Sequence, residues 1–374
     1  MAAKWLVVGA GLTGCTIAER IASTLDQKVI VIDRRNHIGG NTYDYYDEAG
    51  ILVHRYGPHI FHTQSQRVWD YLSRFTKWKN YTHRVLAHVQ NQYVPLPFNL
   101  TSIEKLFSPA KADALIRELL RLYPLEANVP ILRLRETTSK EIKSLADYIY
   151  QHVFYGYTVK QWGMPPEALD PSVTARVPVR ISRDDRYFQD RFQAMPDPGY
   201  TAMCERMLSH PNIEVLLEVD FKRSRFDIKY SRMVYTGPID EYFECIYGAL
   251  PYRSLDFECR TFTADRVQIA PTLNYPDGRE YTRTVEMKQL TGQKHHRSTI
   301  IVEYPKPYVR GENEPYYPIP QSENEVRANA YRKLAGKLAP EVIFAGRLAD
   351  YRYYNMDQAV ARALSVFDTQ IARS

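Results

Sequence analysis

Apolar residues open the chain in a short continuous run, KWLVV at residues 4–8, and a second run, KVIVID, follows at residues 28–33. Between them, LTGCTIAERIA repeats its apolar positions every three or four residues, which predicts an amphipathic helix. A strand, a helix and a second strand in this order are typical of a parallel α/β unit. A later apolar stretch, IEVLLEVDF at residues 213–221, predicts a further strand of the same sheet, so this domain combines separated stretches of chain.

The middle of the chain changes to helical spacing. SPAKADALIRELLRLYP, residues 108–124, places Ser108 as a helix N-cap and Pro109 in the first turn. EIKSLADYIYQHVF, residues 141–154, predicts a second amphipathic helix that runs directly into FYGYTVKQWG, residues 154–163. These patterns predict a helical lobe.

From residue 250 onward short alternating strands replace the helices, in RVQIAPTLNY, REYTRTVEMKQ and STIIVEY. Pro276-Asp277-Gly278 separates the first two and is a strong turn signal. A hairpin there brings Asn274 and Arg283 close to being cross-strand neighbours, with the register open by a residue or two.

The predicted fold class is therefore α/β: a discontinuous Rossmann-like nucleotide-binding domain with a helical-bundle lobe and an antiparallel β-sheet lobe. We assign residues 1–78, 196–245 and 330–374 to the nucleotide-binding domain, and residues 99–165 to the helical lobe, followed by a mobile substrate loop at about 166–180. Residues 79–98, 181–195 and 246–329 are assigned to the β-sheet domain that binds substrate.

Composition narrows the class of ligand. With 374 residues the chain exceeds one ordinary core, and its net charge of +6 comes without a basic tail or a nucleic-acid motif, so we expect an anionic small molecule rather than nucleic acid. Tyrosine is unusually frequent, with 29 copies, and suits sugars, bases and phosphates. The four cysteines show no CxxC pairing, which favours reduced thiols in a cytoplasmic protein without a metal site, and no apolar run reaches transmembrane length.

The glycine turn after the first strand carries the clearest chemistry. Gly9, Gly11 and Gly14 have the GxGxxG spacing, which allows a tight turn, close approach of a pyrophosphate and close packing of helix on strand. Asp33 ends the second strand, where an acid binds a ribose hydroxyl. Together with RRNHIGGN at residues 34–41 and a returning strand, loop and helix after Gly346, the pattern resembles FAD-binding oxidoreductases such as amine oxidases, and FAD is the expected cofactor.

Several motifs together closely resemble one family, the bacterial UDP-galactopyranose mutases, over essentially the whole chain. Besides the glycine turn, they are RNHIGGN, YGPHIFHT, GYTVKQWG, RVPVR, DDRYFQDRFQ, YTGPID, YTR, EPYYPI and GRLADYRYYNMD. The resemblance implies a redox-neutral isomerase that interconverts UDP-galactopyranose and UDP-galactofuranose on reduced FAD. It further implies that flavin N5 attacks the anomeric carbon and displaces UDP, and that the covalent adduct reopens and recloses the sugar ring before UDP returns.

The resemblance also implies residue roles. The substrate would contact Phe154, Tyr157, Trp162, Arg176, Tyr187, Asn274, Arg283, Tyr317 and Tyr353. The catalytic residues would be Arg176, Arg283, His62 and Arg347. FAD would be held by Gly9, Gly11, Thr13, Gly14, Asp33, Arg34, Gly40, Asn41, His59, Ile60, Val219, Arg347, Tyr354, Asn355 and Met356. A cytoplasmic homodimer that supplies galactofuranose for cell-surface polysaccharide is implied as well.

Two positions depart from the family pattern. Asn355 stands before the last helix where relatives commonly have aspartate; both residues cap helices, so we expect the fold to survive with less negative charge near the cofactor. His83 stands where similar relatives place an asparagine near the uridine, which leaves the base contacts there open.

Two other functions are consistent with the same sequence patterns. An oxidoreductase of amine-oxidase type would need a site for nicotinamide or use oxygen, and the sequence has no second glycine fingerprint. A non-catalytic flavoprotein that binds nucleotide sugars would be expected to have lost some of the arginines and aromatic residues that are present here. Consumption of oxygen or NADPH in proportion to product would favour the first function.

Overall fold

The computed structural model describes residues 4–175, 177–224 and 227–373. The apolar runs near the N-terminus form the centre of a five-stranded sheet in which all neighbouring strands are parallel. Its strands, in spatial order, are β12 (Ile213–Leu216), β2 (Lys28–Ile32), β1 (Lys4–Val8), β13 (Arg232–Tyr235) and β19 (Val342–Phe344). The strand order reverses between β1 and β13, and ligands of such sheets bind at this point of reversal.

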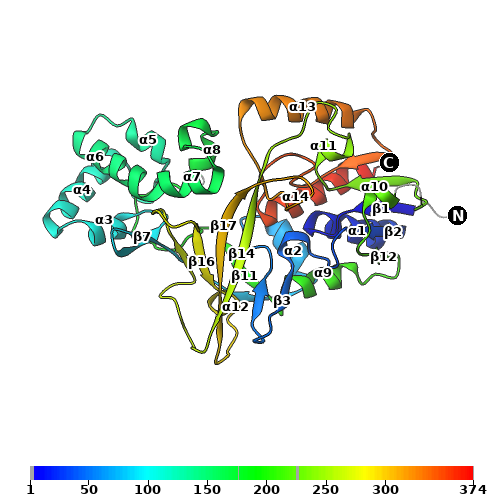
Figure 1. Ribbon diagram of the computed structural model, residues 1–374, viewed down its shortest axis with the longest axis horizontal. Coiled ribbons are helices and arrows are strands. Elements are labelled where there is room, and N and C mark those ends of the chain that lie inside the picture. Colours follow the sequence, from blue (N-terminus) through cyan, green and yellow to red (C-terminus); the bar gives the residue numbers. More distant parts are fainter. Residues whose placement is uncertain (1–3, 176, 225–226, 374) are drawn as a thin grey trace.

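Helices cover both faces of this sheet (Figure 1). On one face α1 (Leu12–Leu25) contacts α9 (Tyr200–Leu208) and α14 (Met356–Val366), which continues into the π-helix η4 (Phe367–Ile371). The other face carries short helices and one long one: α10 (Phe221–Ser224), α11 (Ile239–Tyr242) and α13 (Ser322–Gly336). The strand predicted at 213–221 forms only over its first residues: β12 ends at Leu216, parallel to β2, and Phe221 already begins α10. The predicted discontinuous Rossmann-like fold is confirmed.

A seven-stranded sheet forms the second part. Its strands, in spatial order, are β18 (Tyr317–Pro318), β14 (Tyr252–Phe262), β17 (Ser298–Pro307), β16 (Arg283–Glu286), β15 (Thr272–Asn274), β7 (Val85–Val89) and β8 (Gln92–Leu96). Every pair is antiparallel except β15 with β7. Asn274 and Arg283 are directly opposed across the β15–β16 hairpin, as predicted. The alternating pattern after Arg283 ends sooner than expected, because the chain turns into α12 (Met287–Thr291).

The helical lobe is placed beside β7 and β8 (Figure 1). It consists of α3 (Leu100–Leu106), α4 (Pro109–Leu122), α5 (Ile131–Arg135), α6 (Lys140–Ile149), the π-helix η2 (Tyr150–Tyr155), α7 (Gly156–Trp162), the 3₁₀ turn η3 (Pro166–Ala168) and α8 (Ser172–Ala175). Ser108 is the N-cap of α4, although its side chain makes no capping hydrogen bond. The helix from α6 through α7 ends at Gly163, which has φ +74°.

Smaller elements connect these parts. A three-stranded sheet has the order β5 (Phe61–Thr63), β11 (Phe192–Asp197) and β6 (Lys77–Asn80), next to α2 (Gln66–Ser73). Two ribbons pair β3 (Asp44–Tyr46) with β4 (Leu52–His54) and β9 (Asn128–Val129) with β10 (Val179–Arg180), and η1 (Gly40–Thr42) is a 3₁₀ turn. The domain boundaries we placed after residues 78 and 195 fall inside β6 and β11, because this sheet bridges the two domains.

Within the described ranges, no helix is long and apolar enough to cross a membrane.

Candidate functional site

The glycine turn at the end of β1 leaves no room for a side chain at Gly9 or Gly14. A Cβ on Gly9, which has φ +105°, would lie 2.1 Å from Thr236 Oγ1, and a Cβ on Gly14 would lie 1.9 Å from the carbonyl oxygen of Gly9. Gly11 is the N-cap of α1 and offers no capping side chain. The turn therefore presents backbone amides at the start of a 14-residue helix, an arrangement that binds phosphate groups.

Asp33 lies directly beside this turn. Its two carboxylate oxygens accept hydrogen bonds from the backbone amides of Ala10 at 2.8 Å and Arg35 at 2.9 Å. The amide of Val219 donates to the carbonyl oxygen of Asp33 at 2.9 Å, while Arg34 forms an ion pair with Glu314 at 2.6 Å. Asp33 is thus fixed at the end of β2, where an acid binds the ribose of a dinucleotide.

Two further glycines bring distant segments against the turn. A Cβ on Gly40 would lie 2.8 Å from the Cα of Gly11, and a Cβ on Gly346 would lie 3.2 Å from Thr13 Oγ1. The segment after β2 and the segment after β19 therefore both close on the same turn. Asn41 follows Gly40, and its Oδ1 accepts two hydrogen bonds from Arg35, each of 3.1 Å.

A cavity of about 1160 Å³ extends from this region between the nucleotide-binding domain, the helical lobe and the seven-stranded sheet. It is lined by most of the residues predicted to bind substrate or flavin: Asn41, His59, Ile60, His62, Tyr157, Trp162, Tyr187, Asn274, Arg283, Tyr317, Arg347, Tyr353, Tyr354, Asn355 and Met356. Gly9, Gly11, Thr13, Gly14, Asp33, Arg34, Gly40 and Val219 lie outside the cavity lining, at or behind the glycine turn.

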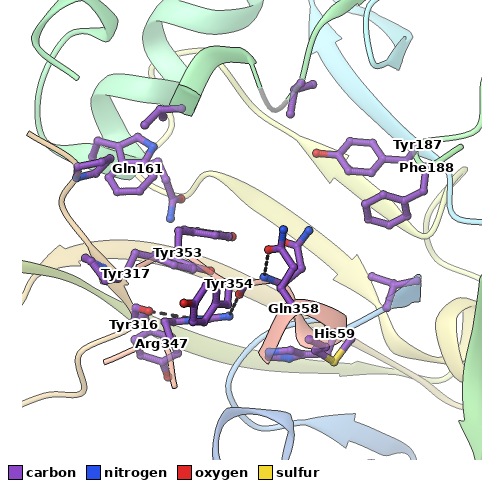
Figure 2. Close-up of a pocket in the computed structure, with 18 of the residues that line it drawn as sticks. His59, Gln161, Tyr187, Phe188, Tyr316, Tyr317, Arg347, Tyr353, Tyr354 and Gln358 are labelled. Carbon is purple, nitrogen blue, oxygen red and sulfur yellow. Dashed lines mark hydrogen bonds between the residues drawn. The ribbon is translucent and has the colours of Figure 1, made fainter. Parts of the chain in front are cut away.

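Aromatic rings form opposite walls of the cavity (Figure 2). Tyr187 and Phe188 lie on one side, and Tyr317 and Tyr353 lie on the other as a parallel stack with centroids 5.2 Å apart. The guanidinium of Arg347 is 5.7 Å from the Tyr317 ring and 5.4 Å from the Tyr353 ring. This wall combines flat faces, hydroxyl groups and a positive charge, which suits a nucleotide or a flavin.

Arg347 is held by the chain around it. Its guanidinium donates to the backbone carbonyl of Tyr354 at 2.6 Å and to that of Tyr316 at 3.3 Å. Asn355 caps α14 in a capping box with Gln358, so the asparagine does preserve the helix start as expected. The polar surface at this end of the cavity is consequently fixed by main-chain contacts.

Arg283 supplies a second positive charge. Its side chain forms a two-point ion pair with Glu303 on β17, with distances of 2.9 Å and 2.7 Å, and Glu303 is only 1% exposed. Burial favours a lower pKa for Arg283, but the Glu303 carboxylate outweighs it and the pKa is raised. Burial also raises the pKa of Tyr157, so this phenol stays protonated beside the guanidinium. Arg283 is thus a fixed cation in the cavity lining, with 25% of its side chain exposed.

Three histidines line the cavity: His59, His62 and His83. The Nδ1 atom of His62 lies 2.8 Å from Asp190, and its ring stacks on Phe188 with a centroid distance of 3.7 Å. Burial lowers the pKa of His59 to about 3 and that of His83 to about 3, so both are neutral near pH 7. The Nδ1 atom of His83 lies 3.0 Å from the hydroxyl of Tyr81.

Four buried polar atoms on cavity-lining residues have no hydrogen-bond partner among the described residues: Gln161 Oε1, Arg180 Nε, Thr272 Oγ1 and Asn274 Oδ1. Buried polar groups are almost always hydrogen-bonded, so these atoms indicate a polar ligand. Sequence reasoning missed Gln161 and Thr272, as well as Glu303. The alternation of the predicted hairpin does place Thr272 on the same face as Asn274, which was a usable signal.

Two predicted substrate contacts are not placed in the cavity. Phe154 is 7% exposed, packs in the apolar core of the helical lobe and does not line the cavity, because it lies in the π-helical segment η2 with its ring turned toward that core. Arg176 lies outside the described residues. The segment predicted as a mobile loop contains η3, α8 and β10, and Arg180 in β10 is buried and paired with Glu126 at 2.8 Å.

Comparison with known proteins gives the family. A family model described as UDP-galactopyranose mutase matches residues 152–353, and one described as an NAD(P)-binding Rossmann-like domain matches residues 7–75. A probable UDP-galactopyranose mutase of Klebsiella pneumoniae is 39% identical, over 97% of this chain and 93% of the relative. The chain belongs to the UDP-galactopyranose mutase family.

The UDP-galactopyranose mutases are isomerases, so the predicted enzyme class is confirmed. Another relative, a dTDP-fucopyranose mutase of Escherichia coli, is 35% identical over 96% of both chains. The crystal structure of a reduced UDP-galactopyranose mutase superimposes with a TM-score of 0.76 at 15% identity, covering 100% of this chain and 95% of the other, which confirms the fold class.

Proposed function

We propose that this protein is a UDP-galactopyranose mutase that interconverts UDP-galactopyranose and UDP-galactofuranose on reduced FAD. The observation that carries the proposal is the position of Arg283 and Arg347 in one cavity with Tyr157, Tyr317 and Tyr353, directly beside the glycine turn. Fixed positive charges suit an anionic nucleotide sugar and cofactor, and flat rings suit a base and a flavin. Family membership supports the same reaction.

The residues present fit FAD. Gly9 and Gly14 allow the tight turn and the close packing of α1 that present backbone amides to a pyrophosphate, and Asp33 is fixed at the ribose position. The cavity volume of about 1160 Å³ has room for both a flavin ring and a sugar nucleotide. Arg34, Asn41, His59, Ile60, Val219, Tyr354, Asn355 and Met356 complete the proposed cofactor contacts.

The chain's own residues would bind, orient and shield the substrate. Tyr157 stacks on the base, and Arg283 holds the diphosphate as it leaves, together with the hydroxyl groups of Tyr187, Tyr317 and Tyr353. Trp162 lines the cavity close to the proposed substrate position, and Asn274 offers its unpartnered oxygen to a hydroxyl group. When bound, reduced flavin supplies the nucleophile for the anomeric carbon. His62, which is held by Asp190, and Arg347 would lie at the edge of the reacting region. Arg176 is proposed as a second diphosphate contact.

The direct test is turnover. The purified protein is expected to be yellow. After reduction with dithionite under anaerobic conditions, it should convert UDP-galactofuranose to UDP-galactopyranose, and anion-exchange chromatography measures the two sugar nucleotides. The oxidised protein, lacking the reduced cofactor, should convert little. Absence of conversion by the reduced, FAD-loaded protein contradicts the proposal. Stoichiometric consumption of oxygen or NADPH would instead indicate an oxidoreductase.

A second nucleotide sugar has specific support, because a dTDP-fucopyranose mutase is among the relatives that match nearly the full chain. His83 is one of the two cavity-lining residues at which this chain departs from the family pattern, Asn355 being the other, and the His83 ring lies 5.6 Å from that of Tyr187. The same assay with dTDP-fucofuranose separates the two substrates. A kcat/KM for the UDP sugar at least about tenfold higher supports the proposed substrate.

Membership in the UDP-galactopyranose mutase family also supports the proposal of a cytoplasmic homodimer that provides galactofuranose for cell-surface polysaccharide. Size-exclusion chromatography with light scattering would measure the mass in solution.

A further inference from the structure

Lys160, in the middle of the GYTVKQWG segment, makes an unusual set of contacts. Its ammonium on α7 lies within hydrogen-bonding distance of four backbone carbonyls, those of Tyr275, Asp277, Arg279 and Tyr281, which share its three N–H donors; the last three distances are each 3.0 Å. All four belong to the connection between β15 and β16. A single side chain therefore gathers alternate carbonyls of this turn around one positive charge.

The same helix touches the turn a second time. Gly156 lies four residues before Lys160, on the same face of α7. A Cβ at Gly156 would lie 2.0 Å from the carbonyl oxygen of Pro276. The helix backbone thus packs directly on the turn at Gly156, and Lys160 binds the rest of it one helical turn later.

These contacts join two walls of the cavity. The turn leads on one side to Asn274 and on the other to Arg283, which are cross-strand partners. Tyr157 and Gln161 follow Gly156 and Lys160 on α7, and both line the cavity. Lys160 itself is not one of the described residues that line the cavity. It can therefore affect a ligand only through neighbouring residues.

The charges around Lys160 leave its ammonium protonated at neutral pH. Burial lowers its pKa to about 8, with Asp277 acting to raise it and Arg279 acting to lower it. Asp277 is itself paired with Arg279 and lies 3.2 Å from the Nδ1 atom of His88 on β7. The carboxylate of Asp277 is thus already paired with Arg279, and the four backbone carbonyls are the partners of the Lys160 ammonium.

We propose that Lys160 is a positioning residue: its ammonium fixes the β15–β16 turn against α7 and so sets the spacing between Tyr157 and the pair Asn274 and Arg283 that a nucleoside diphosphate needs. This inference rests on the proposed function, in which Tyr157 binds the base and Arg283 the diphosphate. A neutral side chain of similar length would leave the carbonyls without their common donor and let the turn move.

The test compares Lys160→Met with Lys79→Met in the reduced and oxidised holoprotein. Lys79 is a matched control, because its ammonium also donates to a backbone carbonyl, that of Thr291 at 2.9 Å, away from α7. Titration calorimetry with UDP is expected to give a Kd at least about tenfold higher for Lys160→Met, and kinetics a higher KM with a smaller change in kcat. Flavin content should stay at the wild-type level, and Lys79→Met should bind UDP normally.

A double-mutant cycle separates positioning from general damage. In an Arg283→Lys background, the loss caused by Lys160→Met should be clearly smaller than in the wild type, because both changes act on the same contact. Lys160→Gln is the second variant should the methionine protein not fold. If wild-type protein binds UDP and a folded Lys160 variant binds it within twofold, the inference is overturned. If the wild type itself fails to bind UDP, the proposed function fails instead.

Discussion

Arg283→Ala is expected to abolish measurable turnover while the protein keeps its flavin. Arg283 lines the cavity, and Asn274 is its direct neighbour across the hairpin, whereas the glycine turn and Asp33 lie on other strands. Charge-assisted hydrogen bonds to phosphate contribute about 1.5–3 kcal/mol each, so losing two lowers kcat/KM by roughly 10²–10⁴. Steady-state kinetics with UDP-galactofuranose and the absorbance ratio of flavin to protein measure the two effects separately.

Arg283→Ala is also expected to lower stability, and a control variant must separate this effect from the loss of phosphate binding. Glu303 is 1% exposed and loses its only ion-pair partner in the described part of the chain, which lowers the free energy of unfolding by up to about 3 kcal/mol. The double variant Arg283→Ala/Glu303→Gln takes away the stranded charge and should recover most of the melting temperature, without activity. Arg283→Lys keeps the charge and should be intermediate. Wild-type turnover by Arg283→Ala would refute the role of this residue.

How far the sequence predicts the site depends on how local the signal is. The glycine turn, Asp33 and the capping of α14 by Asn355 follow from residues close together in the chain, and all three were predicted. The pairing of Asn274 with Arg283 could also be predicted, because a strong turn signal lies between them.

What could not be predicted arises from contacts between distant segments. The parallel pairing of β15 with β7 and the three-stranded sheet of β5, β11 and β6 join stretches that carry no mutual signal in the sequence. The family resemblance implies a substrate contact for Phe154, whereas the π-helical turn at η2 directs its ring into the helical core. The four carbonyls around Lys160 are likewise invisible in a pattern of side chains.

Gly14→Ala is expected to cause the largest loss of cofactor. The added Cβ would lie 1.9 Å from the carbonyl oxygen of Gly9 and 3.1 Å from its carbonyl carbon, and both atoms belong to the backbone of the phosphate-binding turn. Since neither can move aside as a flexible side chain would, α1 must shift away from β1. Overpacking of this kind costs about 1–3 kcal/mol, and here it also displaces the amides that face the pyrophosphate.

Purified Gly14→Ala protein should therefore contain little or no flavin, as measured by absorbance at 450 nm. Its melting temperature, measured by differential scanning calorimetry, should be several degrees lower than that of the wild type. Gly336→Ala is the matched control, because a Cβ at this last residue of α13 meets nothing within 4 Å. It should keep full flavin content and gain up to about 1 kcal/mol of stability, since alanine costs less backbone entropy in a helix than glycine. A Gly14→Ala protein with stoichiometric flavin would show that close packing of α1 on this turn is not what the cofactor requires.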